Sequence, residues 1–72
     1  MQVRELIQAA IKRAGSQAKL GKAIGKTQNA VHQALKRGSV TAEMAVSIER
    51  AMEGEIRKEQ LRPDLFAQDS AA

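Results

Sequence analysis

Apolar residues recur at helical spacing through most of the chain. In the first segment they stand three and four positions apart, at Val3, Leu6, Ile7, Ala10, Ile11 and Ala14. Such a stripe is typical of a helix that buries one face, so we expect a helix over about residues 2–14. Gly15 and Ser16 follow this segment. Because glycine tolerates the backbone of a helix C-terminus and serine accepts hydrogen bonds from free amides at an N-terminus, the pair predicts the end of one helix and the start of the next.

Two short segments with the same period come next, and they predict helices at about 17–24 and 28–37. The residues expected to face inward are Leu20, Ile24, Val31, Ala34 and Leu35. Thr27 stands immediately before the second segment and is its expected N-cap. Two short helices joined by a tight turn form a helix-turn-helix unit. We therefore predict such a unit at about residues 17–36.

Two glycines support this prediction. Gly25 falls in the turn, where a positive φ is usually needed and glycine adopts it at little cost. Gly21 stands in the middle of the first helix, where a glycine costs about 1 kcal/mol relative to alanine. We infer that the second helix passes so close to Gly21 that its backbone would clash with a larger side chain.

The remainder of the chain is also predicted to be helical. Thr41 is the expected cap of a helix at about 42–53, which Gly54 would end. The inner face of this helix is expected to consist of Met44, Ala45, Ile48, Ala51 and Met52. The segment 55–57 is too short to predict a strand, although its Ile56 could make an extended contact, and 58–61 could add one helical turn before Pro63.

The sequence contains no run of alternating apolar and polar residues that would indicate a β-strand, so the predicted fold class is all-α. We expect one compact domain at residues 1–66 and a flexible C-terminal tail at 67–72, because the last residues are small and polar. A chain of 72 residues buries a small core, so self-association is an expected source of stability.

One side of the second motif helix is polar. Its residues are Gln28, Asn29, His32, Gln33 and Lys36. Amide side chains can donate and accept hydrogen bonds at the edge of a base in the major groove, and no acidic residue lies among them to repel phosphate. A polar stripe is equally typical of any surface helix, so alone it indicates only exposure to solvent. Combined with the glycines, the cap and the apolar spacing it favours DNA binding, although such units also serve protein contacts.

Charge is divided unevenly along the chain. Residues 1–37 contain eight Lys and Arg against one Glu, which is +7, and residues 38–72 contain four against seven Asp and Glu, which is −3. The two halves sum to the net charge of +4. A basic part that contains the motif and an acidic part away from it are expected of a protein that meets a polyanion with one face. The alternative is that the lysines only keep a small domain soluble.

Several functional classes are excluded. The chain has no cysteine and a single histidine, His32, so it offers neither a disulfide framework nor the ligands of a metal site. We find no nucleophile, general base or phosphate loop, and we therefore expect neither an enzyme nor a cofactor. The only aromatic residue is Phe66, which argues against proteins that stack single-stranded bases. Without a signal peptide or a long apolar run, a cytoplasmic protein with no membrane association is expected.

Two segments resemble a known family. They are SQAKLGKAIGKTQNAVHQALKRG, at the predicted motif, and IERAMEGEIRKEQLRPDLF, nearer the C-terminus. The chain resembles the Cro-type phage repressors and the related YdaS-like antitoxin or regulator proteins, within the lambda-repressor-like group of helical DNA-binding domains. The likeness covers about residues 5–66. It implies a compact domain of four to five helices. The ending LRPDLF is the part most specific to the YdaS-like branch, and the sequence gives no physical account of it.

The resemblance also implies roles for individual residues. The residues matching positions that face base edges are Gln28, Asn29, His32 and Gln33. Those implied to contact or lie near phosphates are Gln17, Thr27, Lys36 and Arg37. Lys26 is expected near a phosphate from its charge alone, although such a lysine can also only raise the background potential. Gln17 is further implied to support Gln28. At Ala34 the chain departs from the family, whose members often carry a bulky apolar residue there, so the packing beneath the second motif helix is expected to be looser.

Taken together, these features predict a transcriptional regulator of Cro type from a phage or prophage, acting in the cytoplasm of a bacterial host. It would bind a pseudo-palindromic operator in double-stranded DNA and so occlude a promoter. We expect a weak homodimer that DNA strengthens. One alternative is a YdaS-like antitoxin that regulates its own operon and has a toxin or repressor as partner protein. Another is a helical protein-interaction module that does not bind DNA.

Overall fold

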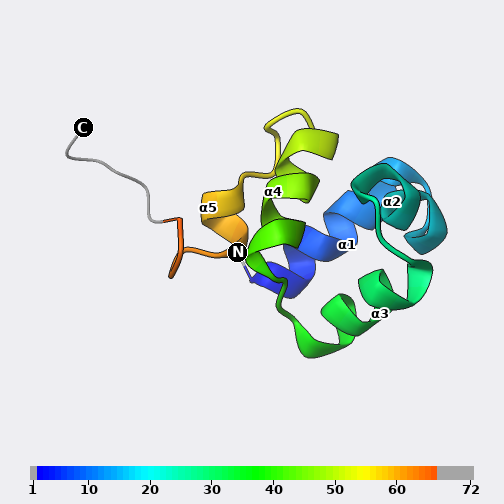
Figure 1. The fold of residues 1–72 in the computed structure, drawn as a ribbon, viewed down its shortest axis with the longest axis horizontal. Coiled ribbons are helices and arrows are strands. Elements are labelled where there is room, and N and C mark those ends of the chain that lie inside the picture. Colours follow the sequence, from blue (N-terminus) through cyan, green and yellow to red (C-terminus); the bar gives the residue numbers. More distant parts are fainter. Residues whose placement is uncertain (1, 67–72) are drawn as a thin grey trace.

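The computed structural model describes residues 2–66, and these form five helices and no strand. The helices are α1 (Val3–Ala14), α2 (Gln17–Ile24), α3 (Gln28–Arg37), α4 (Ala42–Ala51) and α5 (Lys58–Leu61). In Figure 1, α1 crosses the middle of the view, with α2 and α3 on its right and α4 and α5 on its left. The all-α prediction is confirmed, as is the additional turn at 58–61. The predicted tail at 67–72 lies outside the described residues.

Three of the helices begin at the predicted caps. The hydroxyl oxygens of Ser16, Thr27 and Thr41 each accept a hydrogen bond, 3.1 Å long, from the amide three positions further along the chain. Each bond satisfies one of the amides that has no partner within its helix, and such a cap contributes about 1 kcal/mol. The starts of α2, α3 and α4 were therefore encoded locally in the sequence.

The predicted end of the fourth helix was wrong by two residues. α4 ends at Ala51, not at 53, because Glu53 takes a positive φ of 55° and cannot continue the helix. Gly54 follows with a φ of 83°, and its amide donates to the carbonyl of Glu49 over 3.0 Å. Gly54 thus closes the turn after the helix, which agrees with its predicted role as a terminator. A left-handed glutamate is uncommon, and nothing in the local sequence announces it.

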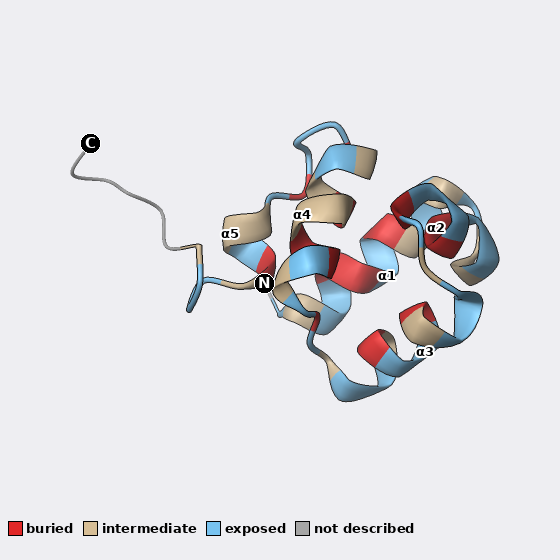
Figure 2. Ribbon diagram, in the orientation of Figure 1, coloured by how far each residue is buried: buried red, intermediate tan, exposed pale blue. Residues whose placement is uncertain are grey.

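A single aliphatic core joins all five helices. The predicted inward residues Leu20, Ile24, Val31 and Ala34 are buried, and Leu35 is partly buried. Ile56, between α4 and α5, is also buried, but it lies in a bend and not in an extended segment. Figure 2 shows the buried positions of α3 turned toward the other helices and its exposed positions turned outward.

The backbone passes very close to Gly21 in α2. A Cβ placed there would lie 2.8 Å from the carbonyl oxygen of Lys26 and 3.0 Å from that of Thr27. The predicted close approach is therefore real, but the neighbour is the turn that leads into α3, not the helix itself. Gly25 has the predicted left-handed conformation, with a φ of 73°. These two glycines allow α2 to be followed so tightly by α3.

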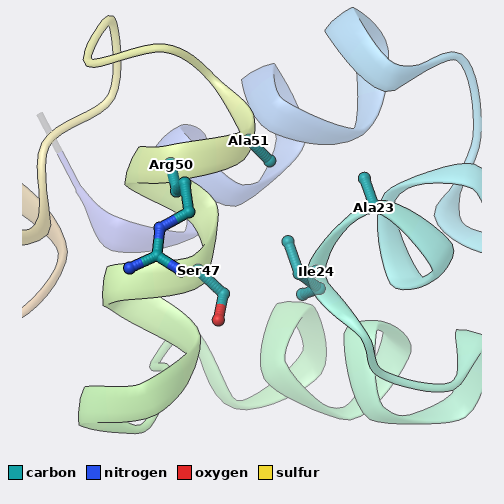
Figure 3. A pocket seen from close by; sticks show the side chains of 5 residues that line it. All are labelled: Ala23, Ile24, Ser47, Arg50 and Ala51. Atoms are coloured by element: carbon teal, nitrogen blue, oxygen red, sulfur yellow. The ribbon is translucent and has the colours of Figure 1, made fainter.

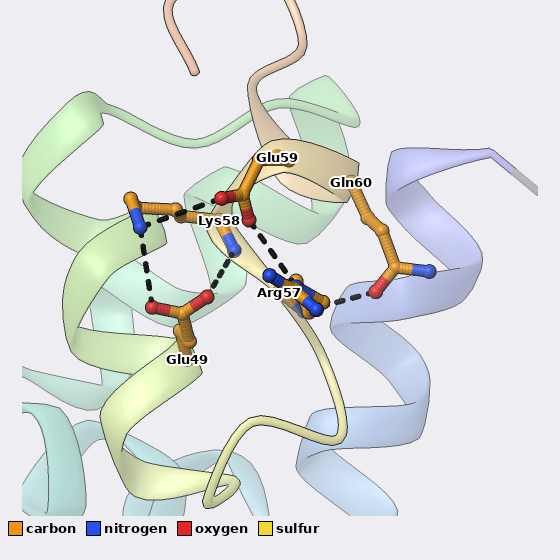
Figure 4. Close-up of polar contacts among 5 residues, drawn as sticks. All are labelled: Glu49, Arg57, Lys58, Glu59 and Gln60. Atoms are coloured by element: carbon orange, nitrogen blue, oxygen red, sulfur yellow. Dashed lines mark hydrogen bonds and ion pairs between the residues drawn. The ribbon is translucent and has the colours of Figure 1, made fainter. Parts of the chain in front are cut away.

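Polar contacts attach α5 to α4 (Figure 4). The Lys58 amide donates to Glu49 over 3.2 Å, and the Lys58 ammonium lies 3.6 Å from Glu49 and 3.5 Å from Glu59. The side chain of Glu59 is only 15% exposed and also lies 3.5 Å from the guanidinium of Arg57. A hydrogen bond from its own backbone amide lowers the pKa of Glu59, despite an opposing effect of burial, and the charges of Lys58 and Arg57 lower it further.

Candidate nucleic-acid interface

The outward side of α3 carries the side chains predicted to contact bases. Gln28, Asn29, His32 and Gln33 are all exposed, and we call these four residues the polar face of α3. On the opposite side of the helix, Val31 and Ala34 are buried against the core. Because the inner side of α3 packs against α1 and α2, these helices fix its position and leave its outer side exposed to solvent (Figure 2).

The N-terminus of α3 is held by Thr27, which the resemblance placed near a phosphate. Its hydroxyl oxygen accepts the hydrogen bond from the Ala30 amide. A threonine hydroxyl also has one hydrogen to donate, so the cap leaves Thr27 able to donate to a phosphate oxygen. Gln17 is half-buried at the start of α2. The hydrogen bonds found within residues 2–66 do not include one between Gln17 and Gln28, and the support implied for Gln28 stays a prediction.

The other predicted phosphate contacts differ in how accessible they are. Lys36 and Arg37 are exposed in the last turn of α3, beside the polar face. Lys26 lies in the turn before α3 and forms an ion pair with Glu43 of α4. The hydrogen bond and the charge of Lys26 lower the pKa of the Glu43 carboxyl. The positive charge of Lys26 is therefore offset by an acid in this structure, whereas Lys36 and Arg37 form no ion pair with any acidic residue of the part that the structure describes.

The sequence profile of the family described as bacterial toxin YdaS matches residues 7–70 of the chain. The chain belongs to the YdaS family. Among solved structures, it is similar to the Cro protein of the Xfaso 1 prophage element in Xylella fastidiosa strain Ann-1, with a TM-score of 0.81 and 36% sequence identity. That match covers 93% of this chain and 98% of the Cro chain. Comparison with curated proteins finds no significant match.

In this member of the YdaS family, two contacts near α3 were not found by reasoning from the sequence. The Arg4 guanidinium, from the first turn of α1, donates to two carbonyls at the end of α3, 31 and 32 positions away. Glu43 reaches Lys26 across 17 positions. Neither pair has a local signal, because helical periodicity relates only residues three or four apart.

The departure from the family at Ala34 has a structural counterpart. Ala34 is buried, and it lines a hollow of about 180 Å³ together with Val40 and Met44. Arg37 and Arg62 also line this hollow. A larger apolar side chain at position 34 would have some of this space to occupy, and the looser packing implied for this member of the YdaS family stays a prediction.

A second groove, of about 210 Å³, lies between α2 and α4. Figure 3 shows Ala23 and Ile24 on one side of it and Ser47, Arg50 and Ala51 on the other. These side chains include no carboxylate or imidazole that could act as a general base. Residues 2–66 contain no group of three or more His, Asp or Glu that could hold a metal ion. Within the same part of the chain, no helix is long and apolar enough to span a bilayer.

Proposed function

We propose that this protein is a sequence-specific transcriptional regulator of the phage or prophage Cro type, with a DNA-binding domain at residues 1–66. The observation that carries the proposal is the polar face of α3, which is exposed, free of acidic residues and followed by two cations. The similarity to a prophage Cro protein supports it. The proposal involves no catalytic step and no cofactor.

In the proposed complex, α3 enters the major groove of double-stranded DNA, which is wide enough for a helix. Gln28 and Gln33 present amides that can bond two groups on one base edge, and Asn29 and His32 add further donors and acceptors. Lys36 and Arg37 contact phosphates at the C-terminal end of the helix. Such contacts fix the register of a protein on the duplex, while base contacts select the sequence. Occupancy of an operator by the protein would block a promoter.

We further propose that the protein binds its operator as a weak homodimer, because one small domain contacts too few base pairs to select a site. Two copies would meet half-sites about one helical turn, roughly 34 Å, apart, and the operator would be pseudo-palindromic. We place the dimer contact on α4 and the segment after it, since the polar face of α3 is committed to DNA. Leu65 lies in that segment with 53% of its surface exposed.

A second candidate function comes from the description of the matched family as a toxin. In this alternative the domain acts together with a partner protein of a toxin-antitoxin pair, and DNA binding serves to regulate the operon. The resemblance in the sequence pointed to the antitoxin, whereas the family description names the toxin. Growth of cells that express the protein alone distinguishes these two roles, since a toxin slows growth and an antitoxin does not.

Fluorescence anisotropy with labelled duplexes tests the proposal. A duplex selected from random DNA by the protein and a shuffled duplex of equal composition are titrated at several salt concentrations. We expect tighter binding to the selected duplex and a linear decrease of log affinity with log salt. Lys36→Ala should lower the slope by about 0.9 on both duplexes, while Lys12→Ala, an equal loss of charge on α1, should change it less. If no duplex binds even at low salt, the protein is an interaction module instead.

A further inference from the structure

Two arginines from distant parts of the chain hold the segment that leaves α3. The Nε of Arg4 donates to the carbonyl of Leu35 over 3.1 Å, and its Nη2 donates to the carbonyl of Lys36 over 3.2 Å. The Nη1 of Arg62 donates to the carbonyl of Val40 over 2.9 Å. Hydrogen bonds from α1 therefore hold the last turn of α3, and a hydrogen bond from the segment after α5 holds the loop that follows. We call this region, residues 35–40, the exit of α3.

Arg4 meets the helix at a place that favours a cation. The last four carbonyls of a helix have no partners within it, and the helix dipole makes this end negative. The guanidinium also packs against the backbone of Gly38, the C-cap of α3, where an added Cβ would lie 3.0 Å from Nη2 of Arg4. Gly38 has a φ of 73° and donates to the carbonyls of Ala34 and Leu35. Arg4 thus completes the cap that ends α3.

Arg62 is itself held by a neighbour. The carboxylate of Asp64 accepts from two nitrogens of the Arg62 guanidinium, over 3.0 Å at Nε and 2.7 Å at Nη2. This bidentate pairing fixes the plane of the guanidinium and leaves Nη1 directed at the Val40 carbonyl. Leu61, the residue before Arg62, is buried in the core. The ending LRPDLF, which had no physical account from the sequence, therefore connects the C-terminal segment to the exit of α3.

We propose that Arg4 and Arg62 are positioning residues that set the orientation of the polar face of α3. The inference rests on the proposed function, since it concerns how α3 meets DNA. The inner side of α3 is formed partly by Ala34, a small side chain that borders a hollow, so the two arginines add polar contacts at an end of the helix where the apolar contact is small. Bidentate contacts to base edges need a precise approach, and a tilt of α3 would weaken them while leaving phosphate contacts within reach.

Arginine-to-lysine variants isolate this role because they keep the charge. A lysine has one ammonium and no rigid fork, so it cannot bond two successive carbonyls as Arg4 does. In Arg4→Lys and Arg62→Lys we expect the preference for the selected duplex over the shuffled one to fall by roughly 5- to 150-fold, the discrimination given by one bidentate base contact. The slope of log affinity against log salt should stay at the wild-type value. Arg13→Lys, the same substitution on another part of α1 where the arginine pairs with Glu55, should keep the wild-type preference.

Arg4→Met separates positioning from phosphate binding. If this variant loses affinity for both duplexes by the same factor, and the slope of its log affinity against log salt drops by about 0.9, Arg4 is a phosphate contact. That result overturns the inference. Unchanged preference in both lysine variants would overturn it as well. All titrations are made well below the melting temperature of each variant, so that loss of folded protein does not mimic loss of preference.

A measurement without DNA keeps this inference distinct from the proposed function. The amides of Gly38 and Ser39 donate to the Ala34 carbonyl over 2.8 and 3.2 Å, and their hydrogen exchange reports opening of the α3 C-terminus. We expect faster exchange at these amides in Arg4→Lys than in the wild type. Unchanged exchange would show that Arg4 does not hold this end. A wild-type protein with no preference for any duplex would instead contradict the proposed function, and the exchange result would still stand.

Discussion

Substitution of Gly21 should reveal how tightly the turn before α3 is packed against α2. In Gly21→Ala the new Cβ would lie 2.8 Å from the Lys26 carbonyl oxygen, 3.0 Å from the Thr27 carbonyl oxygen and 3.1 Å from the Thr27 carbonyl carbon. All three are backbone atoms, so no side chain can rotate away to relieve the clash. The turn would have to move, and it would carry the start of α3 with it.

The expected magnitude is the difference between two effects. Alanine in the middle of a helix gains about 1 kcal/mol over glycine, whereas overpacking costs about 1 to 3 kcal/mol. With three backbone contacts this short we expect the cost to prevail in Gly21→Ala, and Gly21→Val should be worse because its extra methyl groups meet the same turn. A loss of 1 kcal/mol lowers the melting temperature of a domain this size by roughly 4 to 8 °C, and the whole stability is only about 5 to 15 kcal/mol.

Thermal and urea unfolding followed by circular dichroism measure the effect. Ala18→Val provides the matched control, since Ala18 is exposed in the same helix and the substitution tests the lower helix propensity of valine without the clash. We expect a much smaller decrease in melting temperature for Ala18→Val than for Gly21→Val. If Gly21→Val melts at the wild-type temperature or above it, the close approach of the turn is not a constraint on this fold and the reasoning is refuted.

Three further predictions concern charge and assembly. Glu43→Gln should release Lys26 from its ion pair, so that binding to the selected and the shuffled duplex strengthens alike and the slope of log affinity against log salt rises by up to about 0.9. Glu53→Gln removes the same charge elsewhere and serves as the control. An identical response of both variants would argue against the ion pair. Arg62 lowers the pKa of Asp64 from its ordinary 3.8 in the folded protein, so the pair adds stability above that pH and loses it as the pH falls through the lowered pKa. Asp64→Asn should therefore melt below the wild type at neutral pH and converge with it in acid, which melting curves across pH will show; a constant difference would contradict the pairing. Sedimentation of the complex should give two chains for each operator, and a single chain on an intact operator would exclude the proposed dimer.

The elements of the fold could be predicted from local patterns. Thr27 and Thr41 cap helices where a hydroxyl residue precedes an apolar period, and Gly25 adopts the left-handed turn that was expected. The end of α4 could not be predicted, because it depends on a left-handed Glu53, a conformation that glutamate takes only when its surroundings impose it. The capping residues thus predicted where the helices start, but they did not predict where α4 ends.

The candidate site was predicted only in part. The exposure of Gln33 follows from the helical period, which places it on the side of α3 opposite Val31, while Gln28 is exposed as the first residue of the helix. The partners of Arg4 and Lys26 could not be predicted, because each contact joins helices that meet only in the folded chain. Lys26 was expected near phosphate without knowledge of Glu43. A sequence pattern fixes which face of a helix is exposed, but it does not show which charges are already neutralised by another element.

Selection of binding sites from random double-stranded DNA, carried out with the wild type, Gln28→Ala and Gln33→Ala, tests the central claim most directly. The account predicts that the wild type selects a pseudo-palindromic sequence. Each variant should lose preference at particular base pairs, with a cost of about 1 to 3 kcal/mol on the selected site and nearly unchanged binding to other DNA. If both variants recover the wild-type sequence undiminished at every position, the polar face of α3 does not select the sequence and the account is contradicted.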